Sequence, residues 1–148
     1  MDRFRQALRV VSMGSLLVFG ACGMVQMAPS STSMTARLSG ASEVPAVSTD
    51  ATGRVEVSFA AGTKLLTWKI TYSGLSGPAT GAHFHGPAMV GENAAVVVPI
   101  GAPLTSPITG SATLTPSQAV DLSAGKWYVN LHTAAKPNGE IRGQVVLQ

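Results

Sequence analysis

Hydrophobic and polar residues alternate along most of the chain, in short runs bounded by Gly, Pro or Asn. In residues 54–60, Val55, Val57 and Phe59 point to one side and polar residues to the other. A period of two is typical of a β-strand with one buried face. The same alternation predicts a second strand within residues 64–73, and the Gly-Thr-Lys before it predicts a hairpin turn.

The pattern predicts six further strands. They cover residues 36–40, 79–85, 94–100, 108–114, 126–132 and 140–147. Eight short strands without a long helical pattern predict an all-β fold, an antiparallel β-sandwich or Greek-key barrel. Trp68 and Trp127 lie on the apolar faces of their strands, so we expect both in the core.

One short helix is predicted between the sixth and seventh strands. Thr115 suits the N-cap, Pro116 the first helical position and Gln118 the third, which together form a capping box. We expect this helix to end by Gly125.

The N-terminus has the pattern of a signal peptide, in residues 1–21. A basic stretch precedes an apolar run, residues 10–21, that is too short to span a bilayer as a permanent helix. The only cysteine, Cys22, follows at once. Residues 17–22 resemble the bacterial lipobox, with Phe19 where Leu is usual, and this resemblance implies a lipidated Cys22 that anchors the chain to a membrane.

This resemblance also predicts the location of the protein. Gly23 stands where an Asp would favour the inner membrane, so we expect a cell-envelope lipoprotein at the outer membrane or its periplasmic face. The alternative is an ordinary secreted protein with an incidental Cys22. Lipidation would explain a lone cysteine in an exported chain, where cysteines are normally paired.

A flexible tether is predicted for residues 22–34, because they lack charge and periodicity. The domain proper is then residues 35–148. The tether holds three methionines, whose thioethers are soft ligands suited to Cu(I), although a plain linker is the favoured interpretation. These are Met24, Met27 and Met34.

Composition excludes several function classes. The chain has 148 residues, enough for one domain, and a net charge of +3. Without residues 1–21, seven positive charges face six negative ones, so we expect no nucleic-acid partner. No nucleophile motif and no phosphate-binding glycine loop is present, and we assign no catalytic residue.

The three histidines of the chain carry the candidate chemistry. Strand periodicity places His83 and His85 on one face, opposite Phe84, and places His132 on the polar face of its own strand. Three neutral imidazoles suffice to hold Zn(II) or copper with one coordination position open. The alternative is half-exposed strand histidines bonded to loop carbonyls. Met89, in the adjacent loop, is a further candidate ligand, although packing is the usual role of such a residue.

Three motifs in order resemble a known family. They are ASEVPAVSTDATGRVEVSF, TGAHFHGPA and AGKWYVNLHTAAKPNGEIRGQV. Together they resemble the CHRD domain, named after chordin and common in bacterial exported proteins, over residues 35–148. Ala46 stands where the family usually has a second proline. The resemblance implies a β-sandwich outside the cytoplasm but no defined activity.

The remaining polar motif residues have two interpretations. Glu43 and Arg142 are expected to form a structural ion pair where the chain ends meet. Alternatively, Glu43 or Glu140 ligates or orients the metal.

The layout of the histidines and a C-terminal Arg also resembles that of copper-zinc superoxide dismutases. The bridging histidine and the zinc ligands of those enzymes have no counterparts here, so we do not expect efficient dismutation.

Two hypotheses for function follow. The first is a lipid-anchored protein that binds copper or zinc through His83, His85 and His132. The second is a metal-free binding module for a protein or polysaccharide partner.

Overall fold

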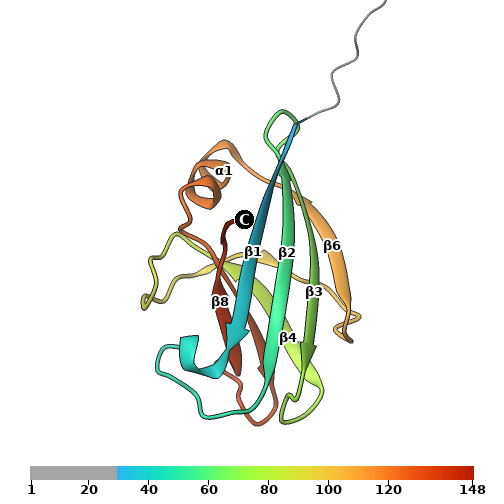
Figure 1. Ribbon diagram of the computed structural model, residues 1–148, viewed down its shortest axis with the longest axis vertical. Coiled ribbons are helices and arrows are strands. Elements are labelled where there is room, and N and C mark those ends of the chain that lie inside the picture. The colour runs from blue at the N-terminus through green and yellow to red at the C-terminus, as the bar shows by residue number, and fades with distance from the viewer. Residues whose placement is uncertain (1–29) are drawn as a thin grey trace, which may run out of the picture.

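The structure, a computed structural model, describes residues 30–148 (Figure 1). The predicted signal peptide, Cys22 and most of the predicted tether lie outside the described residues. The elements are β1 (Ser31–Ser39), the 3-10 helix η1 (Gly40–Ser42), β2 (Thr52–Ala60), β3 (Leu65–Ser73), β4 (Ala79–His85), β5 (Val96–Pro99), β6 (Ile108–Thr113), α1 (Pro116–Ser123), β7 (Tyr128–Thr133), β8 (Ile141–Gln144) and β9 (Val146–Leu147).

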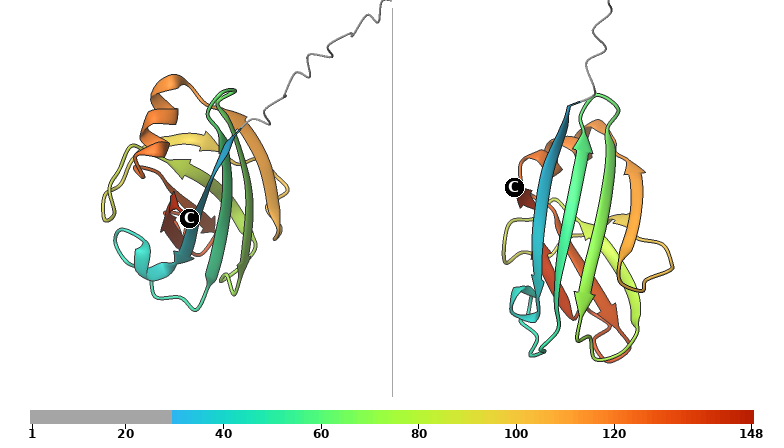
Figure 2. Two further views of the ribbon diagram at one scale, coloured as in Figure 1. Left: turned by 45° about the horizontal axis from the view of Figure 1, so that its top comes forward. Right: turned by 45° about the vertical axis from the view of Figure 1, so that its right-hand side comes forward.

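The strands form one antiparallel sheet that curls into a nearly closed barrel. Its strand order is β5-β4-β7-β8-β1-β2-β3-β6, and the two-residue β9 pairs with β1. In Figures 1 and 2, β1, β2, β3 and β6 form one wall and β4 and β8 lie in the opposite wall. The end strands β5 and β6 do not pair, which leaves one open seam. The predicted all-β fold is confirmed.

Alternation in β2 and β3 builds one wall of the core. Val55 pairs with Ile70 and Val57 pairs with Trp68, and all four side chains are buried. The residues between them face outward, as the period of two requires.

Aromatic side chains join the two walls through the interior. Phe84 on β4 contacts Trp68 of β3 edge to face, with ring centroids 5.2 Å apart, and lies 6.1 Å from Trp127. Trp127 and Phe84 are fully buried, and Trp68 is 8% exposed. Both tryptophans lie in the core, as predicted.

The helix α1 lies at the same end of the barrel as the β2–β3 hairpin (Figure 1). Its predicted capping box is present, because Thr115 accepts a hydrogen bond from the backbone of Gln118, whose side chain bonds back to the Thr115 N–H. Gly125 follows with φ of 70°, a conformation that favours glycine at a helix end. Leu122 anchors the helix in the core.

The structure corrects two predicted boundaries. β1 begins at Ser31, earlier than the predicted tether end, and Met34 pairs with Val57 and is 2% exposed. Met34 is therefore a core residue and not a tether residue. The predicted last strand is divided at Val145, whose side chain is buried and whose N–H donates to the Trp127 carbonyl at 2.8 Å.

Within residues 30–148, no helix is long and apolar enough to cross a membrane.

Truncation of the central tryptophan tests the core. Trp127→Ala should lower the free energy of unfolding by about 3–5 kcal/mol, because a fully buried aromatic side chain leaves a cavity. Urea unfolding measures the change. Val120→Ala on the exposed face of α1 is the control and should change stability by less than about 0.5 kcal/mol. Equal midpoints for Trp127→Ala and the parent would contradict the burial of Trp127.

Candidate metal centre

The three histidines come together on the outer face of the barrel. β4 and β7 are neighbours, with His83 opposite Asn130, His85 opposite Tyr128 and His132 opposite Gly81. Phe84, between the two histidines of β4, points into the core and is fully buried. The alternation that buries Phe84 therefore turns both neighbouring imidazoles outward, toward the polar face of β7.

The geometry of the three imidazoles suits a single ion. One ligand nitrogen from each of His83, His85 and His132 lies within 4.8 Å of the other two. His83 Nδ1 and His132 Nε2 are 3.1 Å apart. Two nitrogens bound tetrahedrally at about 2.0–2.1 Å from a metal are separated by about 3.3 Å. The three-histidine cluster could therefore hold a metal.

Backbone carbonyls select the tautomers of two histidines. His85 Nδ1 lies 2.9 Å from the Ala94 oxygen, and His132 Nδ1 lies 3.0 Å from the Pro137 oxygen. A carbonyl only accepts, so each Nδ1 must carry the proton. In the neutral imidazoles, both Nε2 atoms then hold free lone pairs, the form in which histidine binds metals.

Asn130 lies where these lone pairs converge. Its Oδ1 is 3.0 Å from His85 Nε2 and 3.0 Å from His132 Nε2. The two Nε2 lone pairs and the amide oxygen together attract a cation. When no cation is bound, the Asn130 amide can rotate so that its NH₂ group donates hydrogen bonds to the imidazole nitrogens instead. Asn130 is thus the central polar residue of the site, a role that the sequence analysis did not assign to it.

A stack of planar groups holds His85 in place. The Tyr128 ring lies parallel to His85 with centroids 4.7 Å apart, and the Arg142 guanidinium lies 3.4 Å from the centre of the Tyr128 ring. Arg142 is 2% exposed and donates to the Glu92 carbonyl and to Asn93 Oδ1. These bonds fix the loop that carries the Ala94 carbonyl.

Electrostatics favour neutral imidazoles here. Burial lowers the pKa of His83, and His132 and His85 lower it further. Burial also lowers the pKa of His132, although the hydrogen bond to Pro137 opposes this and His85 adds to it. Protons therefore compete less with a metal than they would at free histidines.

A cavity of about 320 Å³ opens beside the histidines. Its lining includes His85, His132 and Asn130. The other lining residues are Glu43, Val44, Pro45, Asn93, Ala94, Tyr128 and Asn138. His83 and Met89 do not line it, and Met89 is 56% exposed. The structure thus does not bring Met89 to this cavity.

The expected ion pair between Glu43 and Arg142 does not form. Among residues 30–148 the only ion pair joins Arg54 and Glu56, at 3.5 Å. Arg142 lies on β8, opposite Asn130. Its guanidinium donates hydrogen bonds to oxygen atoms of the 86–95 loop instead of to Glu43. Glu43 is 7% exposed and its Oε1 has no hydrogen-bond partner.

Glu140 has a structural role rather than the alternative role in metal binding. It is fully buried and accepts hydrogen bonds from Thr49 Oγ1, Thr133 Oγ1 and both the N–H and Oγ of Ser76. Burial acts to raise the pKa of Glu140, but these bonds outweigh it and hold the pKa below its ordinary value. The ionised carboxylate joins three loops at one end of the barrel.

A glycine makes room for the cluster. A Cβ at Gly81 would lie 3.3 Å from Cε1 of His83 and 3.5 Å from Cδ2 of His132, closer than the first ring could tolerate without shifting. The His-x-His motif is preceded by this glycine in the sequence, a signal that the sequence analysis did not use.

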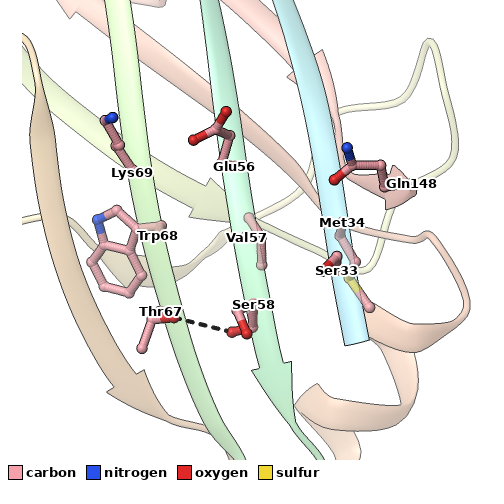
Figure 3. A pocket seen from close by; sticks show the side chains of 9 residues that line it. All are labelled: Ser33, Met34, Glu56, Val57, Ser58, Thr67, Trp68, Lys69 and Gln148. Atoms are coloured by element: carbon pink, nitrogen blue, oxygen red, sulfur yellow. Dashed lines mark hydrogen bonds between the residues drawn. The ribbon is translucent and has the colours of Figure 1, made fainter. Parts of the chain in front are cut away.

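A second hollow, of about 350 Å³, lies beside β1, β2 and β3 (Figure 3). Outward-facing hydroxyls of Ser33, Ser58 and Thr67 form a cross-strand row there, next to Glu56 and Lys69. Its lining contains no histidine or cysteine, so the hollow lacks the imidazole and thiolate groups that bind transition metals.

Fold and site together define a small β-barrel with a histidine cluster on its outer wall. The chain matches the model of the CHRD domain family over residues 34–145 and belongs to that family. Comparisons with curated proteins and with solved structures gave no match.

The buried acid Glu43 makes stability depend on pH. Burial raises the pKa of Glu43 from 4.5 to about 7, although Arg142 and the Val44 N–H act to lower it. The native state then keeps a proton that the unfolded chain loses above pH 4.5. The stabilisation is present at low pH and is lost as the pH rises through about 7.

Comparison with Glu43→Gln isolates this effect in metal-free protein. Between pH 5 and pH 8, the parent should lose about 2–3 kcal/mol of unfolding free energy relative to the variant. Urea unfolding of both proteins at both pH values measures the difference, and the contributions of the histidines cancel. An identical pH dependence of the two proteins would contradict the raised pKa.

Proposed function

We propose that this CHRD domain binds one transition-metal ion, copper or zinc, through His83, His85 and His132. The observation that carries the proposal is the fixed protonation of two ligands. Ala94 and Pro137 each accept from an Nδ1–H, which leaves the Nε2 atoms of His85 and His132 unprotonated, the form that binds a metal. Carbonyl partners of this kind are typical of metal-binding histidines and strengthen them as ligands.

Copper(II) is the favoured ion. The ligand set consists of imidazole nitrogens, and for such a set affinity follows the Irving–Williams order, with copper above zinc and nickel. Three protein ligands leave a coordination position free for water or another small ligand.

We further propose that the protein is a lipoprotein of the cell envelope, anchored through Cys22. The resemblance of residues 17–22 to a lipobox, directly after an apolar run, supports this. The chain enters β1 at Ser31, and the opposite end of that nine-residue strand, Ser39, pairs with Arg142, which in turn pairs with Asn130 of the site. A strand of nine residues spans about 26 Å. The candidate site therefore lies near the end of β1 that is remote from Ser31.

A metal-free binding module is the second candidate. Ser33, Ser58 and Thr67 form a hydroxyl row (Figure 3). Thr67 pairs with Ser111 of β6, which adds a fourth hydroxyl group to the row. Such a row could hydrogen-bond a protein or polysaccharide partner. This candidate gains weight only if metal binding fails.

Titration of tag-free, metal-depleted protein with copper tests the first proposal. We expect one ion per chain and tighter binding of copper than of zinc or nickel. His85→Ala and His132→Ala should each weaken copper binding at least about 100-fold, because each removes a ligand rather than one of its supporting partners.

Met89→Ala serves as the control, since it removes an exposed thioether that lies outside the cavity, and it should bind as the parent does. Stoichiometry far below one, or histidine variants that bind like Met89→Ala, would favour the metal-free module.

Substitution of the cysteine tests the anchor. The parent should fractionate with membranes and carry lipid mass at its N-terminus, whereas Cys22→Ser should be soluble, because the acyl chains attach to the thiol. Met24→Ser is the control and should fractionate like the parent. Recovery of parent and Cys22→Ser in the same soluble fraction would contradict the lipoprotein proposal.

A further inference from the structure

Large hydrophobic side chains are exposed at the end of the barrel that carries α1. Val120 on α1 is 68% exposed, and Val146 and Leu147 of β9 are 47% and 64% exposed. β9 pairs with the first half of β1, and the C-terminus lies beside α1 in Figure 1. Leu65, which is 39% exposed, begins β3 at the same end. A contiguous apolar surface of this kind marks a contact with another molecule.

Two hollows join these side chains into one surface. The first, of about 570 Å³, lies between α1 and the β2–β3 hairpin, and Val120 is part of its lining. The second, of about 340 Å³, includes Val146 and Leu147. The two hollows share Ser123 and Ala124, so they adjoin. We call the surface formed by these five residues and the two hollows the apolar face.

Few charges surround the apolar face. Lys64 is the only charged residue in the lining of the two hollows. Asp121 lies on α1, and Lys126 lies in the turn that follows the helix. These three residues leave a net charge of +1, which suits a weakly anionic lipid surface.

The chain enters the barrel at this same end. β1 begins at Ser31, and Met34, three residues later, pairs with Leu147 of the apolar face. Cys22, the proposed anchor, precedes Ser31 by nine residues, which span at most about 32 Å. β1 itself is about 26 Å long, so the nine residues would have to be almost fully extended to turn the opposite end of the barrel to the membrane. Such extension costs conformational entropy, and the α1 end is therefore the one that an anchor at Cys22 favours.

We propose that the apolar face docks on the lipid surface that holds the anchor, with Val120 and Leu147 among the acyl chains and Lys64 at the phosphates. This inference rests on the proposed anchoring through Cys22 and is independent of the metal site. The contact needs little affinity of its own, because the anchor makes docking an intramolecular step at high effective concentration. Anchor and face together then orient the barrel on the membrane.

A nitroxide label on an introduced cysteine tests the docking in the full, lipid-anchored chain. Lipidation occupies the thiol of Cys22, so Val120→Cys presents a single free thiol. The labelled protein is placed in vesicles of phosphatidylethanolamine and phosphatidylglycerol, and electron paramagnetic resonance measures how often a polar nickel chelate collides with the label. Ser73→Cys, at the exposed far end of β3, is the matched control. The collision rate at position 120 should be at least about tenfold below that at position 73, because hydrocarbon excludes polar solutes.

A second substitution tests the contribution of β9. Leu147→Ser in the labelled Val120→Cys protein should raise the collision rate at least about threefold, because it removes apolar surface from the contact. Val90→Ser is the matched control, since Val90 is 79% exposed and lines neither hollow, and it should leave the rate unchanged. Equal rates in the two variants would contradict a contact made by Leu147.

The outcomes separate the docking from the anchor. Equal collision rates at positions 120 and 73, in protein that is retained on the vesicles and carries lipid on Cys22, would overturn the docking and leave the anchor in place. A parent protein without lipid on Cys22 would overturn both proposals.

The label also tests other occupants of the apolar face. In Cys22→Ser/Val120→Cys protein without vesicles, the label should collide freely with the chelate. Protection that rises with protein concentration would assign the face to a second copy of the chain. Protection that is independent of concentration would assign it to a segment of the chain itself. Either result would overturn the inference.

Discussion

Core packing on the inner side of β4 and β7 determines what lies on their outer side. Phe84, Val129 and Leu131 are fully buried, and each is flanked by residues that must point away from the core. The pairing of the two strands then sets those outward residues side by side, with His83 opposite Asn130. A register shift of one residue would turn the imidazoles inward and the aromatic ring into solvent, so the energy of the core protects the geometry of the site. The position of the candidate metal site in this domain is therefore a consequence of how its hydrophobic residues pack.

The period of two was enough to predict the strands and the inward positions, because it is a local property of the sequence. Capping of α1 was predictable for the same reason, since the Thr115 and Gln118 side chains bond within one turn. The start of β1 at Ser31 was not predictable from the sequence pattern. Residues 31–33 are polar and exposed, and they form a strand only because the β2 residues Ser58 to Ala60 pair with them. Such pairing joins segments far apart in the chain and leaves no local pattern.

For the candidate site, too, the positions along the strands were predictable from the sequence and the contacts made by the loops were not. Strand phase placed the three histidines on polar faces, and the structure brings them together. The two carbonyls that select their tautomers come from loops, at Ala94 and Pro137, whose paths no periodicity encodes. The prediction of an ion pair for Arg142 was wrong for a related reason. Opposite charges suggested a partner, but the Tyr128 ring beneath Arg142 and the loop oxygens beside it occupy the guanidinium instead.

The burial of Glu43 depends on the second buried carboxyl group of the domain, Glu140. Glu140 receives a bond from Thr49, in the segment that carries Glu43, and follows Gly139, against which Glu43 packs. The hydrogen-bonded carboxylate of Glu140 thereby holds in place the two segments that shield the Glu43 carboxyl group from water. Without Glu140, the segment around Glu43 could relax and expose the acid, and its pKa would return toward the ordinary range. The stability gained from four hydrogen bonds at Glu140 thus offsets the cost of one polar group left unpaired beside the histidines.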